Sequence, residues 1–536
     1  MTGRAYADLA IVDCRVRTLD PAVPFAHAVA VRDGLIVAVG DTAEVRDICD
    51  ARTTVVDGAG MTLVPGLVDS HQHGLSSAEV ARGADLTGVT DLDELRRLLA
   101  AERDRVGDEG WVLGWGADYA AFGPGDLSAQ LIDDAVKGQP ALVRTFDVHT
   151  GLATRRALEL AGVRGPMDLG DGSVVVCHDG VPTGELREYT AVQLVAQAVP
   201  QPTFEEAAEA AARTLSKAAS RGITAIRQMD GSEEKFEMLR HLEEGGRLDV
   251  RVVAPVWQQP DTDEEGTLAN LSLAKRRGRL WRGGLVKFFL DGVIDTGTAW
   301  LLESDSNGLG HQPFWPDIER FAATVRRFSS EGLQCATHAI GDAAVRCALD
   351  AYRTARRPAG VRHTIEHIEL LHDDDLPRFA AENVVASMQP LHLQWLAPDH
   401  SDRWSEAVGP LRARRAYRWG DLQRSGALLV FGSDWPVADF DPRKGMAWAR
   451  LRRPPHSERA PLLPGQALSG LQALECYTTS PARAAGEEAF SGRIAPGCRA
   501  DLSGFAADPV TCSADDLVDV PVLLTVVDGR VVWQTR

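Results

Sequence analysis

Two histidines separated by one residue are the first side chains in this chain whose types and spacing could bind a metal ion. His71 and His73 end the apolar run of residues 62–73. Side chains of a β-strand alternate between its faces, so residues i and i+2 point to the same side and can hold one ion. Alone, the pair is weak evidence for a metal site, because histidines often serve as ordinary hydrogen-bonded polar residues.

Further ligand types end later runs of the same kind. His338 and Asp434 lie at the ends of two apolar runs, and His367 lies within a third. Parallel strands of a barrel bring such residues to one mouth, where catalytic residues are usually found. The set as a whole therefore predicts a metal site.

A lysine lies inside another apolar run. Lys287 is part of VKFFLDG, and an isolated ammonium group in a buried strand is unfavourable. It could form a salt bridge, for example with Asp291. Alternatively, a neutral amine beside two metal ions could take up carbon dioxide and become a carbamate that bridges them. The neighbouring ligand set favours the carbamate.

The elements that must position these residues are strands alternating with helices. Helical segments such as residues 204–220 and 321–330 precede several strand-like runs. Nearly all-apolar strands in this alternation are typical of a parallel sheet that is buried on both faces. Eight such units predict an α/β fold, a (β/α)8 TIM barrel. The runs are residues 62–73, 222–230, 248–257, 284–292, 333–340, 363–369, 384–390 and 428–434.

The remaining segments differ from the predicted barrel in their sequence pattern. Short strands and Asp-Gly turns at both ends of the chain predict two β-rich parts, residues 1–61 and 488–536. The barrel is then expected over residues 62–487. A long gap after its first strand, at about residues 75–203, carries strands of its own and predicts an inserted cap between barrel strands 1 and 2.

The composition of the chain limits which binding partners and which cellular compartment we expect. The 536 residues include 57 basic and 76 acidic residues, a net charge of −19, which disfavours nucleic acid and anionic membranes and favours a small-molecule substrate. No signal-peptide pattern or run of about 20 apolar residues is present, so we expect a cytoplasmic protein. The eight cysteines form no CxxC pair and are expected to be buried thiols. A homodimer is the usual default among oligomers.

The ordered ligand set resembles that of the amidohydrolase superfamily. The segments VPGLVDSHQHG, VKFFLDGVIDTGTA, THAIGDAAV, SMQP and GSDWPV are similar to its branch amidohydrolase family 3, which includes N-substituted formamide deformylase. The resemblance covers the whole chain. It implies that strands from both chain ends form one composite β-sandwich beside the barrel.

The resemblance also implies a binuclear metal centre with two divalent ions, for which zinc is the expected metal. One ion would be held by His71, His73 and Asp434, and the other by His338 and His367, with carboxylated Lys287 and a hydroxide bridging them. That hydroxide would attack the substrate carbonyl. Asp434 would be the catalytic proton shuttle, acting first as a base and then as an acid.

Other polar residues near the strand ends have less certain roles. Asp69 could orient a histidine ligand or simply form a turn. Glu366, next to His367, is expected to point away from the barrel mouth.

Several residues could instead contact the substrate. Candidate substrate contacts are Trp115, His149, Gln389 and His392. Aromatic residues suggest an apolar pocket, although those in the cap could equally form its own core. They are Trp111, Trp115, Tyr119, Phe122, Trp300 and Trp395.

The predicted function is metal-dependent hydrolysis of a non-peptide C–N bond in an amide, formamide or cyclic amide. A lactone or ester hydrolase is an alternative, because the same attack opens either bond. A heterocycle aminohydrolase is disfavoured, since the resemblance implies a glutamate shortly after His338 for that activity, and residues 339–342 contain none. A remote alternative is an inactive binding protein on the same fold.

Overall fold

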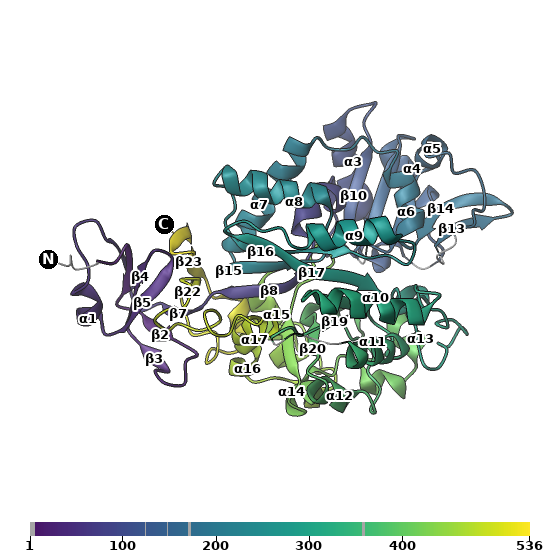
Figure 1. Cartoon of the computed structure of the whole chain (residues 1–536). Helices are drawn as coiled ribbons and strands as arrows, with labels where there is room; N and C mark the ends of the chain where they lie inside the picture. The colour runs from purple at the N-terminus through teal and green to yellow at the C-terminus, as the bar shows by residue number, and fades with distance from the viewer. Residues whose placement is uncertain are drawn as a thin grey trace. The chain divides into compact units, whose positions relative to one another are not determined.

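The computed structural model describes residues 6–123, 125–146, 148–169, 173–355, 358 and 360–535 (Figure 1). The chain forms two compact units. The first comprises Met1–Gln72, Ala212–Asp434 and Asp439–Arg536, and the second comprises His73–Ala211 and Trp435–Ala438.

The first unit contains a nearly closed barrel of eight parallel strands, which confirms the predicted α/β barrel (Figure 1). In order around the sheet the strands are β8 (Leu67–Gln72), β15 (Ile223–Gln228), β16 (Arg251–Trp257), β17 (Trp281–Phe289), β18 (Gln334–Ala339), β19 (Thr364–His367), β20 (Val385–Met388) and β21 (Leu428–Phe431). Seven of the strands lie within one of the eight apolar runs, and β17 begins three residues before its run.

Helices between these strands bury one apolar face. In α10 the residues Phe321, Val325 and Phe328 recur at helical spacing and are buried. The ring of Phe288 in β17 lies 5.6 Å from that of Phe321. Phe288 therefore packs against α10. The longer helices of this unit are α8 (Glu233–Glu244), α9 (Glu264–Leu273), α10 (Ile318–Ser330), α11 (Asp342–Thr354) and α15 (Pro442–Leu451), and the shorter ones are α12 (Leu376–Ala381), α13 (Arg403–Val408), α14 (Trp419–Arg424), α16 (Gly470–Glu475) and α17 (Thr479–Ala484).

The seam between β8 and β21 closes the barrel without a regular strand ladder. The backbone N–H of Asp434 donates to the carbonyl of His71 at 2.7 Å. Gly432 permits this approach, because a Cβ at that position would lie 2.5 Å from the backbone nitrogen of His71. Further along the seam, the backbone N–H of Val68 donates to the carbonyl of Tyr477.

The run of residues 62–73 is two strands rather than the single barrel strand that the sequence predicts. Residues 62–65 form β7 in a different sheet, and only β8 belongs to the barrel. Gly66 separates them at a crowded position, where a Cβ would lie 2.1 Å from the hydroxyl of Thr224. The chain can change sheets there because glycine has no side chain.

Both chain ends contribute to one six-stranded sheet. Its order is β24 (Arg530–Gln534), β23 (Val522–Val527), β22 (Leu502–Phe505), β7 (Thr62–Pro65), β2 (Arg15–Arg17) and β3 (Phe25–Ala26). A four-stranded sheet has the order β5 (Leu35–Gly40), β4 (Ala28–Arg32), β1 (Leu9–Val12) and β6 (Thr54–Asp57), and α1 (Thr42–Arg46) precedes β6. Residues of both sheets, such as Ile11 and Leu502, share one hydrophobic cluster. The composite sandwich and the predicted domain boundaries remain predictions.

The second unit is built on a six-stranded mixed sheet. Its order is β13 (Val174–His178), β14 (Val181–Arg187), β12 (Thr150–Ala153), β11 (Ala141–Thr145), β10 (Val112–Ala117) and β9 (Ala84–Asp85). Its helices include α3 (Leu92–Val106), α4 (Gln130–Val136), α5 (Arg155–Leu160) and α6 (Tyr189–Ala196), and α7 (Phe204–Ala219) continues into the first unit. Phe122 and Tyr119 belong to one hydrophobic cluster of this unit, and Trp111 packs against another. Phe122 is therefore part of the core of this unit, and the partly buried Tyr119 and Trp111 pack against it.

The described parts of the chain contain no helix with the length and apolar character that a membrane span requires.

Candidate metal centre

Five of the predicted ligands lie at the C-terminal ends of the barrel strands. His71, Lys287, His338 and His367 are in β8, β17, β18 and β19, and Asp434 follows β21. All five side chains are buried. Because the strands are parallel, their C-terminal ends meet at one mouth of the barrel.

Two imidazoles approach the carboxylate of Asp434. Nε2 of His71 lies 3.3 Å from Oδ1, and Nδ1 of His367 lies 3.8 Å from Oδ2. Among the described residues, Nδ1 of His367 has no hydrogen-bond partner, although the ring is buried. Imidazole nitrogens beside a carboxylate suit a divalent metal ion, which accepts electron pairs from both. The donor set therefore fits a metal.

The predicted ligands of the second ion lie close by. The rings of His338 and His367 have centroids 4.4 Å apart. Burial lowers the pKa of His367 well below its usual range, and the neighbouring His338 and His71 lower it further. Neutral imidazole is the form that binds metals.

His392, which the sequence predicts as a substrate contact, belongs to the same cluster. Ligand atoms of His367, His392 and Asp434 all lie within 4.8 Å of one another. His392 is in the 3-10 helix η4 (Pro390–Trp395), which follows β20. The spacing that marks ligands on strands cannot identify a residue in such a loop helix.

Glu366 lies inside the barrel beside His71, so the expectation that it points away from the mouth was wrong. Its Oε2 is 2.7 Å from Nδ1 of His71. Side-chain alternation fails at this strand end because His367 and Ile368 have φ angles of 76° and 52°. Burial alone would raise the pKa of Glu366, but the hydrogen bond with His71 and the nearby cations lower it to about 2.

The carboxylate of Asp69 binds backbone N–H groups rather than an imidazole ring. It accepts from the backbone N–H groups of His71 at 3.2 Å and Ser433 at 2.9 Å, and from the Ser433 hydroxyl at 2.6 Å. The side-chain amide of Gln72 donates to it as well. Burial raises the pKa of Asp69 to about 6 in spite of these bonds. Asp69 therefore joins the ends of β8 and β21.

Lys287 is buried and forms no ion pair with Asp291, the salt-bridge partner considered from the sequence. Asp291 instead accepts from the backbone N–H groups of Trp300, Ile340 and Gly341 at 2.8–3.0 Å. Nζ of Lys287 lies 5.0 Å from the ring centroid of Phe289. Burial lowers the pKa of the Lys287 amine, which favours its neutral form.

Three predicted site residues lie in the second unit. His73 is its first residue, and its backbone N–H donates to the carbonyl of Trp435. The ring centroid of Trp115 is 6.1 Å from that of Trp435. Nδ1 of His149 lies 2.6 Å from Oε2 of Glu188. Their roles toward a metal or a substrate remain predictions.

Gln389, a predicted substrate contact, directly follows β20 and is buried. Within the described chain, neither its amide nitrogen nor its amide oxygen has a hydrogen-bond partner. Buried amides normally bind something, so both atoms are available to a ligand.

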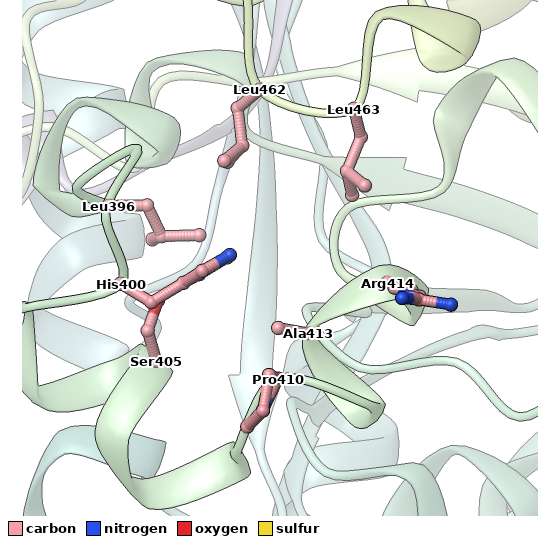
Figure 2. A pocket seen from close by; sticks show the side chains of 8 residues that line it. All are labelled: Leu396, His400, Ser405, Pro410, Ala413, Arg414, Leu462 and Leu463. Carbon is pink, nitrogen blue, oxygen red and sulfur yellow. The ribbon is translucent and has the colours of Figure 1, made fainter.

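A cavity of about 270 Å³ in the first unit contains none of the predicted site residues. Figure 2 shows the His400 ring reaching into it between apolar side chains. Its lining is Leu396, His400, Ser405, Pro410, Ala413, Arg414, Leu462 and Leu463.

Comparisons with known proteins identify the family of this chain. Residues 54–533 match the family described as the amidohydrolase family. Protein LONG AFTER FAR-RED 3 of Arabidopsis thaliana is 30% identical to this chain over 98% of it and 91% of the relative. N-substituted formamide deformylase of Arthrobacter pascens is 26% identical over 97% of each chain.

Solved structures show the same fold. An uncharacterized metal-dependent hydrolase from Pyrococcus horikoshii OT3 aligns with a TM-score of 0.74 and 24% identity, over 94% of this chain and 99% of that one. The family predicted from the motifs is thus confirmed: the chain belongs to the amidohydrolase family and is a hydrolase that acts on carbon–nitrogen bonds.

Proposed function

We propose that this enzyme hydrolyses the C–N bond of an amide, formamide or cyclic amide in a small apolar or aromatic molecule. The observation that carries the proposal is the convergence of buried His71 and His367 on the carboxylate of Asp434. The similarity to N-substituted formamide deformylase over nearly the whole chain supports the choice of bond.

Two divalent ions, with zinc expected, would be held by the predicted set of His71, His73, Lys287, His338, His367 and Asp434. When bound, such ions polarise a carbonyl oxygen and lower the pKa of water, which makes hydroxide available at neutral pH. His392 is an additional candidate ligand because of its place in the cluster.

Lys287 would contribute a carboxylate through a carbamate. Its amine nitrogen would form a bond to the carbon of carbon dioxide and release one proton. Burial favours the neutral amine that this reaction needs, and the absence of an ion pair with Asp291 leaves the amine available.

Asp434 would move the proton during the reaction. Its carboxylate would accept the proton of the attacking hydroxide and deliver it to the leaving nitrogen, because an amide nitrogen leaves poorly unless it is protonated. The backbone bond between the Asp434 N–H and the His71 carbonyl holds this residue at the barrel mouth.

Gln389 and Trp395 would bind the substrate. A carboxamide offers both a donor and an acceptor, which match the two polar groups of an amide. The ring of Trp395 lies 5.2 Å from that of His392, so an aromatic surface lies beside the cluster. We therefore expect bulky apolar substituents to improve turnover.

The test is proton release in a pH-stat, using protein reconstituted with zinc and bicarbonate. The panel contains formamide, N-benzylformamide, acyl amides, cyclic imides, lactones and aminoheterocycles. We expect turnover of amide bonds that a chelator abolishes, with N-benzylformamide turned over faster than formamide. Turnover confined to lactones or to aminoheterocycles would contradict the proposed bond.

The Asp434→Asn variant tests the proton step separately. It keeps an oxygen that can bind metal but is a much weaker base than a carboxylate, so we expect less than about a tenth of wild-type turnover. Metal content measured on the same sample distinguishes a lost proton shuttle from a lost ion. An Asn variant with both metals and higher turnover would rule out the shuttle.

A further inference from the structure

The hydrogen bond between His71 and Glu366 determines which ring nitrogen of His71 carries the hydrogen. Both side chains are completely buried, and Nδ1 of His71 lies 2.7 Å from Oε2 of Glu366. A carboxylate is an acceptor, so Nδ1 carries the hydrogen. In the neutral ring, Nε2 then has the lone pair, and this is the nitrogen 3.3 Å from Oδ1 of Asp434.

Glu366 is itself opposed by a buried cation in the barrel. Arg227 in β15 is buried, and its Nη2 donates to Oε1 of Gln334 and Oγ1 of Thr364, each at 3.3 Å. These contacts hold Arg227 in β15, the strand next to β8 in the barrel. Its positive charge there opposes the negative charge of Glu366 and helps to lower the pKa of Glu366.

Contacts from β18 anchor the same group of side chains. Gln334, which accepts from Arg227, also donates from its Nε2 to the carbonyl of Ala484 at 3.1 Å. Polar side chains of β15, β18 and β19 therefore lie around the carboxylate that binds Nδ1 of His71. The sequence did not predict Arg227, Gln334 or Glu366 as site residues.

We infer that Glu366, opposed by Arg227, is a positioning residue that presents Nε2 of His71 to the metal. The inference rests on the proposed metal site. In characterised metal sites, the partner of the second ring nitrogen fixes the tautomer and the orientation of the histidine, and its loss weakens metal binding.

The test compares zinc affinity in wild-type protein and the Glu366→Gln variant by competition with a chromophoric chelator. Glutamine has nearly the same shape but a weaker acceptor, and its amide can rotate to present a donor. We expect zinc to bind about 10- to 100-fold more weakly. The visible absorption spectrum of the cobalt-substituted protein should also change, since it reports ligand geometry.

Two variants serve as controls. Glu102→Gln alters a buried carboxylate of the second unit that pairs with Arg105, and should leave zinc affinity and the cobalt spectrum unchanged. Arg227→Lys keeps the positive charge, and should weaken zinc binding less than Glu366→Gln does. If Glu366→Gln does not fold, Glu366→Asp replaces it, because its shorter side chain also breaks the 2.7 Å contact with His71.

A measurement without metal separates this inference from the proposed function. In protein labelled with 15N histidine, the His71 signal, assigned by its loss in His71→Asn, should show a hydrogen on Nδ1 in the wild type and a different tautomer population in Glu366→Gln. Wild-type protein that binds no zinc but shows this tautomer would contradict the proposed function only. Unchanged zinc affinity, cobalt spectrum and His71 signal in Glu366→Gln would overturn the positioning role.

Discussion

Asp69 and Glu366 are both fully buried carboxylates that contact His71, yet their pKa values shift in opposite directions. Burial raises the pKa of Asp69 to about 6, because its hydrogen bonds come from neutral backbone and side-chain donors. Burial acts on Glu366 in the same sense, but the hydrogen bond with His71 and the charge of Arg227 help to lower its pKa to about 2. Two equally buried carboxylates therefore differ in ionisation because their neighbours differ.

The two carboxylates also hold different parts of His71. Asp69 lies at the seam between β8 and β21 and binds the backbone N–H groups of His71 and Ser433. Glu366 lies in the barrel interior and binds the imidazole ring. We therefore expect changes at the seam to alter mainly the stability of the barrel, and changes at Glu366 to alter mainly metal affinity.

The largest expected effect at the seam is that of Gly432→Ala. The new Cβ would lie 2.5 Å from the backbone nitrogen of His71, so the backbone of β8 or β21 must move. We expect a loss of about 3 kcal/mol in the free energy of unfolding. Urea denaturation of the metal-free protein measures this loss.

Gly465→Ala is the matched control for that substitution. No atom lies within 4 Å of the Cβ that it would add. It should change the free energy of unfolding by less than about 0.5 kcal/mol. Equal stability of the two variants would mean that the close approach at Gly432 does not hold the seam.

The barrel and most of the buried polar side chains at its mouth could be predicted from the sequence, because both follow from simple patterns. Buried parallel strands are continuous apolar runs, and polar residues at their ends stand out. His71, His338 and Asp434 were found in this way. The positions of Glu366 and His392 could not be predicted, because both lie in or next to irregular backbone. Glu366 precedes a residue with φ of 76°, and His392 lies in a 3-10 helix. The strand change at Gly66 depends on Thr224, which is distant in the sequence.

Asp69→Asn should have the next largest effect on stability. The carboxylate accepts from His71, Ser433 and Gln72, whereas an asparagine has one acceptor oxygen and turns its NH2 group toward the other donors. Leaving buried donors unsatisfied should lower the free energy of unfolding by about 2 kcal/mol. Urea denaturation gives this value, and chelator competition gives the zinc affinity of the same protein.

The comparison with Glu366→Gln makes this prediction specific. Asp69→Asn should destabilise the protein more than Glu366→Gln does, and should weaken zinc binding less. The reverse order in both measurements would show that the seam, rather than the interior carboxylate, orients the His71 ring.

Ser433→Ala should have the smallest effect, because it removes only the hydroxyl donor to Asp69 at 2.6 Å and keeps the backbone donor at 2.9 Å. We expect a loss of about 1 kcal/mol in the free energy of unfolding and no change in zinc affinity. Ser387→Ala is the control, since the hydroxyl of this buried serine in β20 has no hydrogen-bond partner among the described residues. If both variants are equally stable in urea, the Ser433 hydroxyl does not stabilise the seam. The backbone N–H groups that donate to Asp69 would then distinguish this carboxylate from Glu366.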